Sequence, residues 1–160
     1  MSNHLTNLIN ESEVYNFNLD WEFKKADSFP LDKALEKHKD INGKYFYELY
    51  YIPSEWLAIS LPHTFNDEDA FVSRINDGGS NQFQIPLCHE GKKVFIEFEG
   101  IRQTAFVYVN GEMVGYYEAG VAPFGFDISS YVRFNEKNLI AVATDNTATR
   151  NAGCCTAETP

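Results

Sequence analysis

The segment AFVYVNGEMVGYY carries an Asn-Gly pair, Asn110-Gly111, between two apolar runs, and this pair constrains the fold more than any other feature of the chain. A two-residue type I′ turn needs positive φ at both central residues, and Asn-Gly adopts those angles readily. The segment is therefore predicted to be an antiparallel hairpin whose register is set by the turn. The predicted cross-strand pairs are Val109 with Glu112, Tyr108 with Met113 and Val107 with Val114.

Several other segments alternate apolar and polar residues, which is the pattern of a strand with one buried face. The strands predicted on this basis are 15–21, in which Tyr15, Phe17, Leu19 and Trp21 share one face, and 94–99 and 124–128. A last strand is predicted over 139–144, after a loop. We interpret the four alternating residues of 15–21 as a face that packs into the core, rather than as a surface platform for a sugar.

Three segments have weaker signals. The segment 44–56 is rich in Tyr and Phe rings, and we expect it to begin as a strand. Residues 83–87 are expected to be extended after a Gly- and Ser-rich loop. One short helix is expected in 29–43, where apolar residues have helical spacing and Asn42-Gly43 favours a stop.

Turn signals recur every ~8 to 12 residues, as they do in antiparallel sandwiches. The strands do not alternate with long helices, as a parallel sheet would require. A chain of 160 residues suits one domain, and a domain of that size buries ~70% of the surface exposed by its unfolded form. The sequence thus predicts an all-β fold, an antiparallel β-sandwich.

The formal net charge is -10, from 13 basic and 23 acidic residues. Such a field repels phosphate backbones, anionic membrane surfaces and acidic polysaccharides, and it leaves neutral sugars permitted. Nucleic acid and membrane are therefore not expected as partners. No window approaches the ~20 apolar residues of a membrane span, and the first residues lack a basic segment followed by an apolar one. Both a cytoplasmic and a periplasmic or secreted location stay open.

Cys88, Cys154 and Cys155 form an odd set, and a bond between the neighbouring residues Cys154 and Cys155 would be strained. Together with His89 they lack the two-residue ligand spacing of a zinc site. We interpret all three cysteines as thiols and expect neither a metal nor a cofactor.

Four short motifs occur in a fixed order in the last third of the chain. They are Phe-Glu-Gly at 98–100, Val-Asn-Gly at 109–111, Pro-Phe-Gly-Phe-Asp at 123–127 and Asp-Asn at 145–146. Upstream, NLDWEF around Trp21 and SLPHTFN around His63 extend the pattern. Residues 15–146 thereby resemble the amino-terminal sugar-binding domain of glycoside hydrolase family 2, the β-galactosidase and β-glucuronidase group. The resemblance implies a jelly roll of the galactose-binding-domain type.

The resemblance also implies a function: the non-catalytic part of a β-galactosidase-like exo-glycosidase that hydrolyses a neutral glycoside. In that family the catalytic glutamates belong to a later barrel domain of the same polypeptide, and none of them maps to this chain. Exposed carboxylates such as Glu97 and Glu99 are interpreted as ordinary surface groups. The residues expected to contact sugar are Asp145 and Asn146 at the edge of the pocket and the rings of Tyr116 and Tyr117, one of which must point outward.

The expected organisation is an amino-terminal extension over 1–14, the sandwich over 15–146 and an irregular, truncated tail over 147–160. Members of the family continue from Asp-Asn into a final strand, which we do not find, so the sheet is expected to lack its last strand. An open edge invites pairing with another copy of the chain. A free-standing carbohydrate-binding module and a structural or interaction sandwich remain alternatives.

Overall fold

The computed structural model describes residues 12–19, 21–25, 39–50, 56–61, 70–75, 83–101, 104–118 and 122–145, and for 24–25, 70–75 and 145 it describes the backbone alone. The strands are β1 (Trp21–Lys25), β2 (Leu57–Ile59), β3 (Ala70–Ile75), β4 (Phe83–Gln84), β5 (Phe95–Phe98), β6 (Thr104–Val109), β7 (Glu112–Glu118), β8 (Phe124–Asp127), β9 (Lys137–Asn138) and β10 (Ile140–Asp145). A single turn of 3₁₀ helix, Leu87–His89, follows β4.

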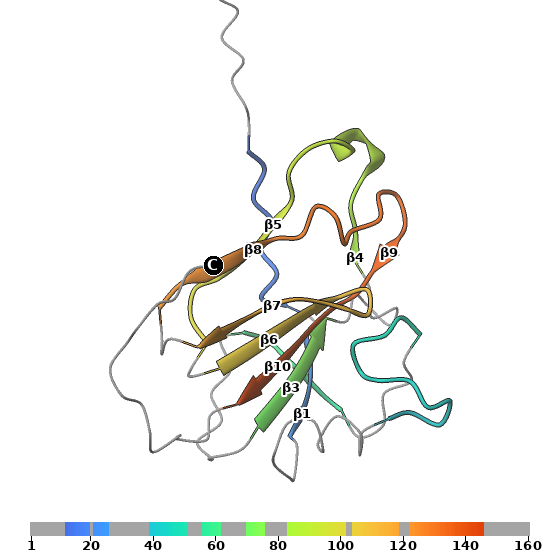
Figure 1. The fold of residues 1–160 in the computed structure, drawn as a ribbon, viewed down its shortest axis with the longest axis vertical. Helices are drawn as coiled ribbons and strands as arrows, with labels where there is room; N and C mark the ends of the chain where they lie inside the picture. Colours follow the sequence, from blue (N-terminus) through green and yellow to red (C-terminus); the bar gives the residue numbers. More distant parts are fainter. Residues whose placement is uncertain are drawn as a thin grey trace, which may run out of the picture.

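One large sheet dominates the molecule, with the strand order β2-β1-β3-β10-β6-β7 (Figure 1). Two short ladders, β5-β8 and β4-β9, form a second layer beside it. Every pair of named strands in these sheets is antiparallel. The predicted all-β antiparallel sandwich is therefore confirmed.

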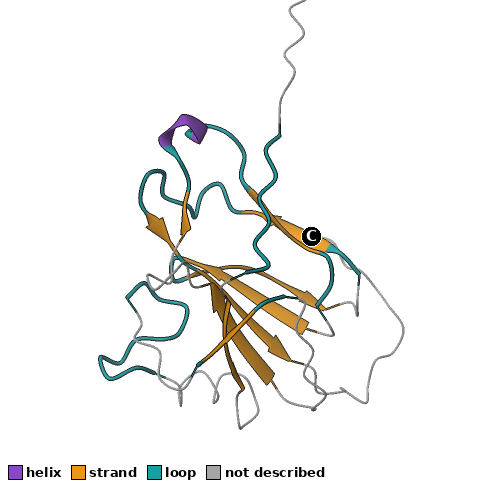
Figure 2. Ribbon diagram, turned by 180° about the vertical axis from the view of Figure 1, so that it is seen from behind, coloured by secondary structure: helices purple, strands orange, loops and turns teal. Residues whose placement is uncertain are grey.

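Figure 2 shows the short ladders beside the large sheet. The main core lies between these two layers, and both supply buried side chains to it. The large sheet contributes Trp21, Ala105, Val107, Val109, Ile140 and Val142, and the second layer with its loops contributes Phe83, Ile128 and Val132. In β5 the residues Ile96 and Phe98 pack against this core while Phe95 and Glu97 are exposed. The predicted strand over 94–99, with one face exposed to solvent, is therefore confirmed.

A second cluster covers the outer face of the large sheet. Phe46 is 1% exposed and lies against Tyr108, Ala141 and Ala143. Because this loop-borne ring covers the outer face, strands β6 and β10 are buried on both sides. Their nearly continuous burial follows from that cover.

The hairpin forms as predicted at its turn. Asn110 has φ 52° and Gly111 has φ 98°. The pairs Tyr108–Met113 and Val109–Glu112 are confirmed, whereas Val107 pairs with Gly115 instead of Val114. One additional residue on β7 makes a β-bulge at this point, so the predicted Val107–Val114 pair is wrong.

The predicted strand over 15–21 is also wrong in its extent, because β1 begins only at Trp21. Tyr15 is 62% and Leu19 66% exposed, so these alternating residues do not share a buried face. The backbone N–H of Asn18 donates to Asn16 Oδ1 at 2.8 Å. Such a local bond competes with strand pairing and accounts for the late start of β1.

The ring-rich segment at 44–50 consists of turns rather than a strand. Asp40 Oδ1 accepts from the N–H groups of Asn42 and Lys44, and Glu48 Oε2 accepts from the N–H of Tyr45. Side chains thereby take bonds that a ladder would need. The rings of this loop pack onto a sheet instead of joining one. Most of the predicted helix, 29–38, lies outside the described residues, and 41–43 form a turn.

Candidate sugar-binding surface

The backbone of Asp145 is placed at the last position of β10, where it pairs with Thr104 of β6 and Ala70 of β3. On the other side of β6, Thr104 pairs with Glu118 of β7. The end of β10 and the end of β7 therefore share one edge of the sheet. Asn146 lies outside the described residues.

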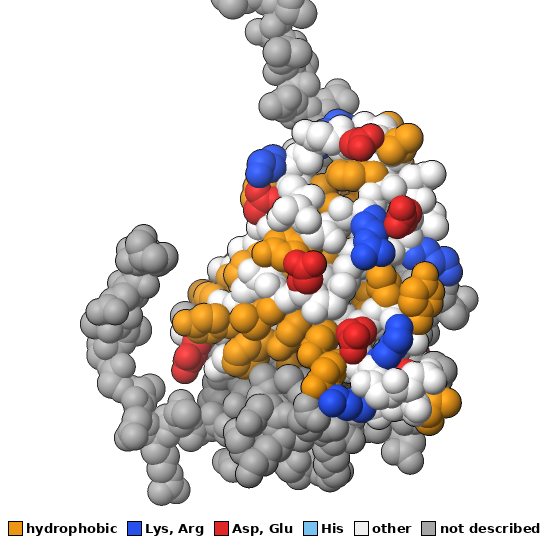
Figure 3. Space-filling model, turned by 45° about the vertical axis from the view of Figure 1, so that its right-hand side comes forward, with side chains coloured by type: hydrophobic (Ala, Val, Ile, Leu, Met, Phe, Trp, Pro, Cys, Tyr) orange, Lys and Arg blue, Asp and Glu red, His pale blue; other side chains and the backbone are white. Residues whose placement is uncertain are grey.

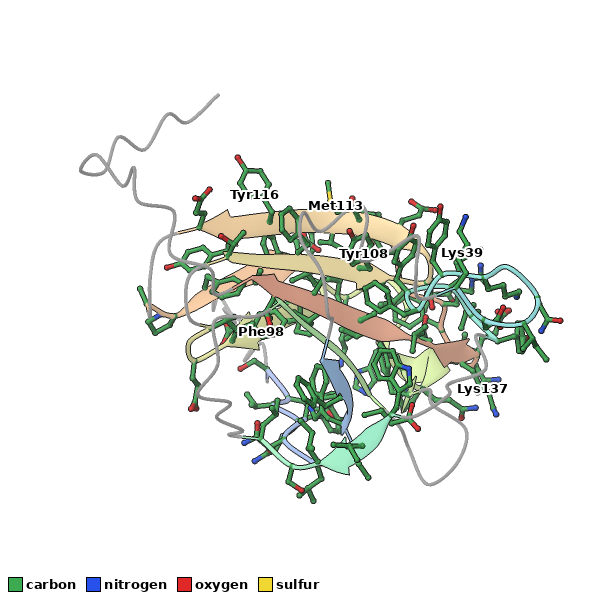
Figure 4. The ribbon with its side chains drawn as sticks, turned by 90° about the horizontal axis from the view of Figure 1, so that it is seen from below. Lys39, Phe98, Tyr108, Met113, Tyr116 and Lys137 are labelled. Atoms are coloured by element: carbon green, nitrogen blue, oxygen red, sulfur yellow. The ribbon has the colours of Figure 1, made fainter. Side chains whose placement is uncertain are left out.

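Tyr116 and Tyr117 stand on β7 near this same end of the sheet, and their rings point to opposite faces. Tyr116 is 61% exposed on the outer face, and its ring lies 6.1 Å from that of Phe106. Figure 4 shows Tyr116 and Met113 projecting from the strand. Tyr117 is half-buried and stacks on Phe124 at 4.0 Å. Of the two rings, Tyr116 offers the open surface.

The acidic corner at Asp127 is a second polar feature, in the motif at 123–127. Lys93 Nζ donates to Asp127 Oδ2 at 2.6 Å, and the hydroxyl and the N–H of Ser129 donate to Oδ1. These hydrogen bonds, first from Lys93 and then from Ser129, lower the pKa of Asp127 from 3.8 to about 2. A carboxyl group with so low a pKa is ionised at neutral pH and cannot act as a general acid. Its role is to hold the corner between β5 and β8.

Two amide side chains, one fully buried and one half-buried, form a network that sequence reasoning missed. The hairpin turn is enough to explain an asparagine at position 110, but the Nδ2 of Asn110 also donates to the carbonyl of Tyr131 at 2.7 Å and to Asn138 Oδ1 at 2.8 Å. Asn138 is fully buried. Nothing local in the sequence pointed to this pair, because the two residues lie 28 positions apart.

Metal ligands are not gathered anywhere in the part of the chain that the structure describes. Cys88 is a free, exposed thiol there, and His89 Nε2 lies 3.5 Å from Glu13 Oε2. Cys154 and Cys155 lie outside the described residues. Among the described helices, none is long and apolar enough to cross a bilayer. On the face shown in Figure 3, acidic and basic side chains are interspersed among hydrophobic ones.

Comparison with known proteins places these features in a family. The model of the glycosyl hydrolases family 2 sugar binding domain matches residues 11–150. A β-glucuronidase of Formosa agariphila is 40% identical over 156 residues, which cover 88% of this chain and 14% of that protein. A β-galactosidase of Thermoanaerobacter pseudethanolicus is 37% identical over 144 residues, which cover 84% of this chain and 17% of that protein.

The fold agrees with a solved structure of a β-glucuronidase from glycoside hydrolase family 2. The TM-score is 0.64 at 34% sequence identity, over 85% of this chain and 14% of that one. The chain thus spans less than a fifth of the length of each of these relatives. Both enzyme names occur among the relatives, so β-galactosidase-like is too narrow a description. The chain belongs to the sugar-binding domain family of the family 2 glycosyl hydrolases.

Proposed function

We propose that this chain is the non-catalytic, amino-terminal sugar-binding domain of a larger family 2 exo-glycosidase. The proposal rests on how small a part of each relative this chain covers. The chain is matched over 11–150 by the sugar-binding domain alone, and it covers only 14% and 17% of two relatives named as glycosidases. The remaining length of such an enzyme has room for the catalytic domain.

Glycoside hydrolysis needs two carboxyl groups across the scissile bond, about 5 Å apart in retaining enzymes. Glu97 and Glu99 are exposed around β5, and Asp127 is bound to Lys93 and Ser129. These acids have the surroundings of surface and structural groups. The two catalytic carboxyl groups are proposed to lie in a barrel domain of the same polypeptide, which this sandwich supports.

The proposed contribution to the substrate pocket comes from the end of the sheet where β10 and β7 finish. Asp145 and Asn146 are proposed to exchange hydrogen bonds with sugar hydroxyls at the rim of the barrel. The exposed ring of Tyr116 and the neighbouring Tyr117 belong to the same end of the domain. This geometry fits a domain that borders a pocket formed mainly by another domain.

The substrate proposed for the parent enzyme is a β-galactoside or a β-glucuronide, as the names of the two relatives suggest. The net charge of -10 favours the neutral β-galactoside. The higher identity, 40% against 37%, favours the β-glucuronide. Aryl glycosides of both sugars distinguish the two.

The test compares the complete polypeptide that carries this chain with the isolated 160-residue chain. We expect the complete polypeptide to hydrolyse one of the two aryl glycosides and the isolated chain to hydrolyse neither. In the complete polypeptide, Asp145→Ala and Asn146→Ala should raise KM, whereas Glu97→Ala, on the exposed face of β5, should not. Ordinary turnover by the isolated chain would overturn the proposal.

A free-standing carbohydrate-binding module is the second candidate, and the exposed ring of Tyr116 favours it. Calorimetric titration of the isolated chain with simple sugars tests it. A binding heat that disappears in Tyr116→Ala supports the module. If millimolar sugars give no heat, this candidate is removed.

A further inference from the structure

A shallow hollow lies at the other end of the sandwich, beside the hairpin turn. The loop residues 44, 45 and 47–50 line one side, and Asn110, Gly111, Glu112 and Arg133 line the other. Its volume of about 620 Å³ falls within the range of small-molecule sites. The hollow is as large as many ligand sites, although it is open to solvent.

The register of β6 and β10 separates this hollow from the residues expected at the glycosidase pocket. Ile140 pairs with Val109, next to the hairpin turn, whereas Asp145 pairs with Thr104 at the far end of both strands. The hollow is therefore a different surface from the one that Asp145 borders.

A column of stacked groups holds the loop against the sheet. The ring of Tyr47 lies 4.4 Å from Tyr108 on one side and 5.2 Å from Tyr45 on the other, and both pairs are nearly parallel. Lys39 Nζ then lies 4.4 Å from the centroid of the Tyr45 ring. Figure 4 shows Tyr108 beside the loop that carries Lys39. These rings are engaged in fixing the loop, so they do not serve as a platform for a ligand.

Tyr50 differs from the rings of this column in two respects. It is 73% exposed, and its backbone φ is 64°, in the left-handed region that a bulky side chain rarely adopts. Such strain persists where the surrounding structure imposes it, and it concentrates at binding sites. Lys44 Nζ, 5.2 Å from the centroid of the Tyr50 ring, donates to the carbonyl of Leu49 at 2.7 Å and steadies the rim.

The polar groups around Tyr50 are balanced in charge, with two cations, Lys44 and Arg133, and two anions, Glu48 and Glu112. Within the described residues, neither the guanidinium of Arg133 nor the carboxylate of Glu112 has an ion-pair partner. Both are exposed at the hollow, where the guanidinium can donate to hydroxyl groups and the carboxylate can accept from them. A ring platform with balanced donors and acceptors suits an uncharged, hydroxyl-rich ligand.

We propose that this hollow is an accessory binding subsite for a neutral sugar ring, which stacks on Tyr50 and exchanges hydrogen bonds with Arg133 and Glu112. The subsite holds saccharide outside the glycosidase pocket. The proposal is independent of the parent enzyme's substrate, because it concerns the isolated chain.

The test is a titration of the ¹⁵N-labelled 160-residue chain with methyl β-D-galactopyranoside, followed by NMR. We expect a millimolar dissociation constant and shift changes at Tyr50, Gly111 and Glu112. In Tyr50→Gly the affinity should fall about tenfold or more, a loss of about 1.4 kcal/mol or more, and unfolding should require at least as much urea because glycine relieves the strained φ. Tyr50→Trp should retain binding, and Glu97→Ala, on the exposed face of β5, should leave it unchanged.

Three results would each overturn the subsite: no shift change at millimolar sugar, shift changes confined to the Tyr116 end of the sheet, or unaltered affinity in Tyr50→Gly. Arg133→Ala and Glu112→Ala separate stacking from hydrogen bonding. Each variant is expected to weaken binding severalfold without a change in urea unfolding, since both side chains are exposed.

Discussion

The amide of Asn138 is a fully buried polar side chain in the described core. Its hydrogen bonds offset the cost of removing the amide from water. Its Oδ1 accepts from Asn110 Nδ2 and from the N–H of Arg133, and its Nδ2 donates to the carbonyls of Arg133 and Glu136. Asn110 Oδ1 in turn accepts from the N–H of Leu139 at 2.9 Å. Two amides thus attach the hairpin turn to the loop that precedes β10.

Replacement of Asn138 by alanine is expected to destabilise the fold by about 3 kcal/mol, because it leaves the Arg133 N–H and the Asn110 amide without their acceptor. Urea unfolding followed by fluorescence measures the change. Glu136→Ala, two positions away and exposed, is the matched control and should change stability by less than about 0.5 kcal/mol. A similar effect of the two substitutions would show that the amide network contributes little.

The Asp127 carboxyl makes the stability of the fold dependent on acidity. Its pKa in the folded state is about 2, below the ordinary 3.8, chiefly because of Lys93 and Ser129. Its contribution is complete above about pH 3.8 and is lost as the pH falls toward 2.

We therefore expect the melting temperature of Asp127→Asn to lie below that of the wild type at neutral pH, with a difference that shrinks from pH 4 to pH 2. Thermal unfolding at a series of pH values tests this. If the difference in melting temperature stays constant between pH 4 and pH 2, the Asp127 carboxyl is not the group that makes stability depend on pH.

At the scale of elements, the bulge in β7 determines how the second layer packs on the large sheet. The bulge places Gly115 opposite Val107. A Cβ atom on Gly115 would lie 2.6 Å from Cε1 and 3.1 Å from Cδ1 of Phe126. The lack of a side chain at Gly115 is what allows the Phe126 ring of β8 to pack against β7.

Gly115→Ala is expected to destabilise the fold by about 1–3 kcal/mol through this overpacking. In a Phe126→Leu background, which removes the ring atoms in the way, the same substitution should have a smaller effect. A double-mutant cycle by urea unfolding measures the coupling between the two positions. Additive effects would show that the ring does not limit the space at Gly115.

At the scale of the whole molecule, the feature that matters for self-association is the open edge of the large sheet. In the described sheet β7 is an edge strand, with Met113 53% and Tyr116 61% exposed along it. Exposed edges invite pairing with a second copy. The bulge and the acidic residues at both ends of β7, Glu112 and Glu118, oppose it, as does the net charge of -10.

We propose that any self-association through β7 depends on salt. Light scattering is expected to show monomers at low ionic strength and association at high ionic strength or near the isoelectric point of about 4.8. Glu112→Lys with Glu118→Lys should change the salt dependence. A strict monomer at high concentration under all of these conditions would exclude pairing through the edge.

Several features of the fold followed from the sequence because their causes are local. Asn110-Gly111 placed the turn, since two neighbouring residues can satisfy its φ angles. Alternation placed β5, and an apolar run placed β10 to within a residue of its start and end. The order of short motifs identified the family. Asp145, Asn146, Tyr116 and Tyr117 remain predictions as sugar contacts.

Other features depended on contacts between segments that are distant in sequence. The bulge at Val107, the bonded amides of Asn110 and Asn138 and the ring column on Tyr108 each join elements that no local pattern relates. The rings of 44–50 have the composition of a strand, but they cover one because Phe46 gains a buried site on the outer face of the sheet. The sequence by itself determined the class, the hairpin turn and the family. Only the tertiary structure decided which apolar residues became core and where a hollow opened, because burial depends on what the rest of the chain brings against each side chain.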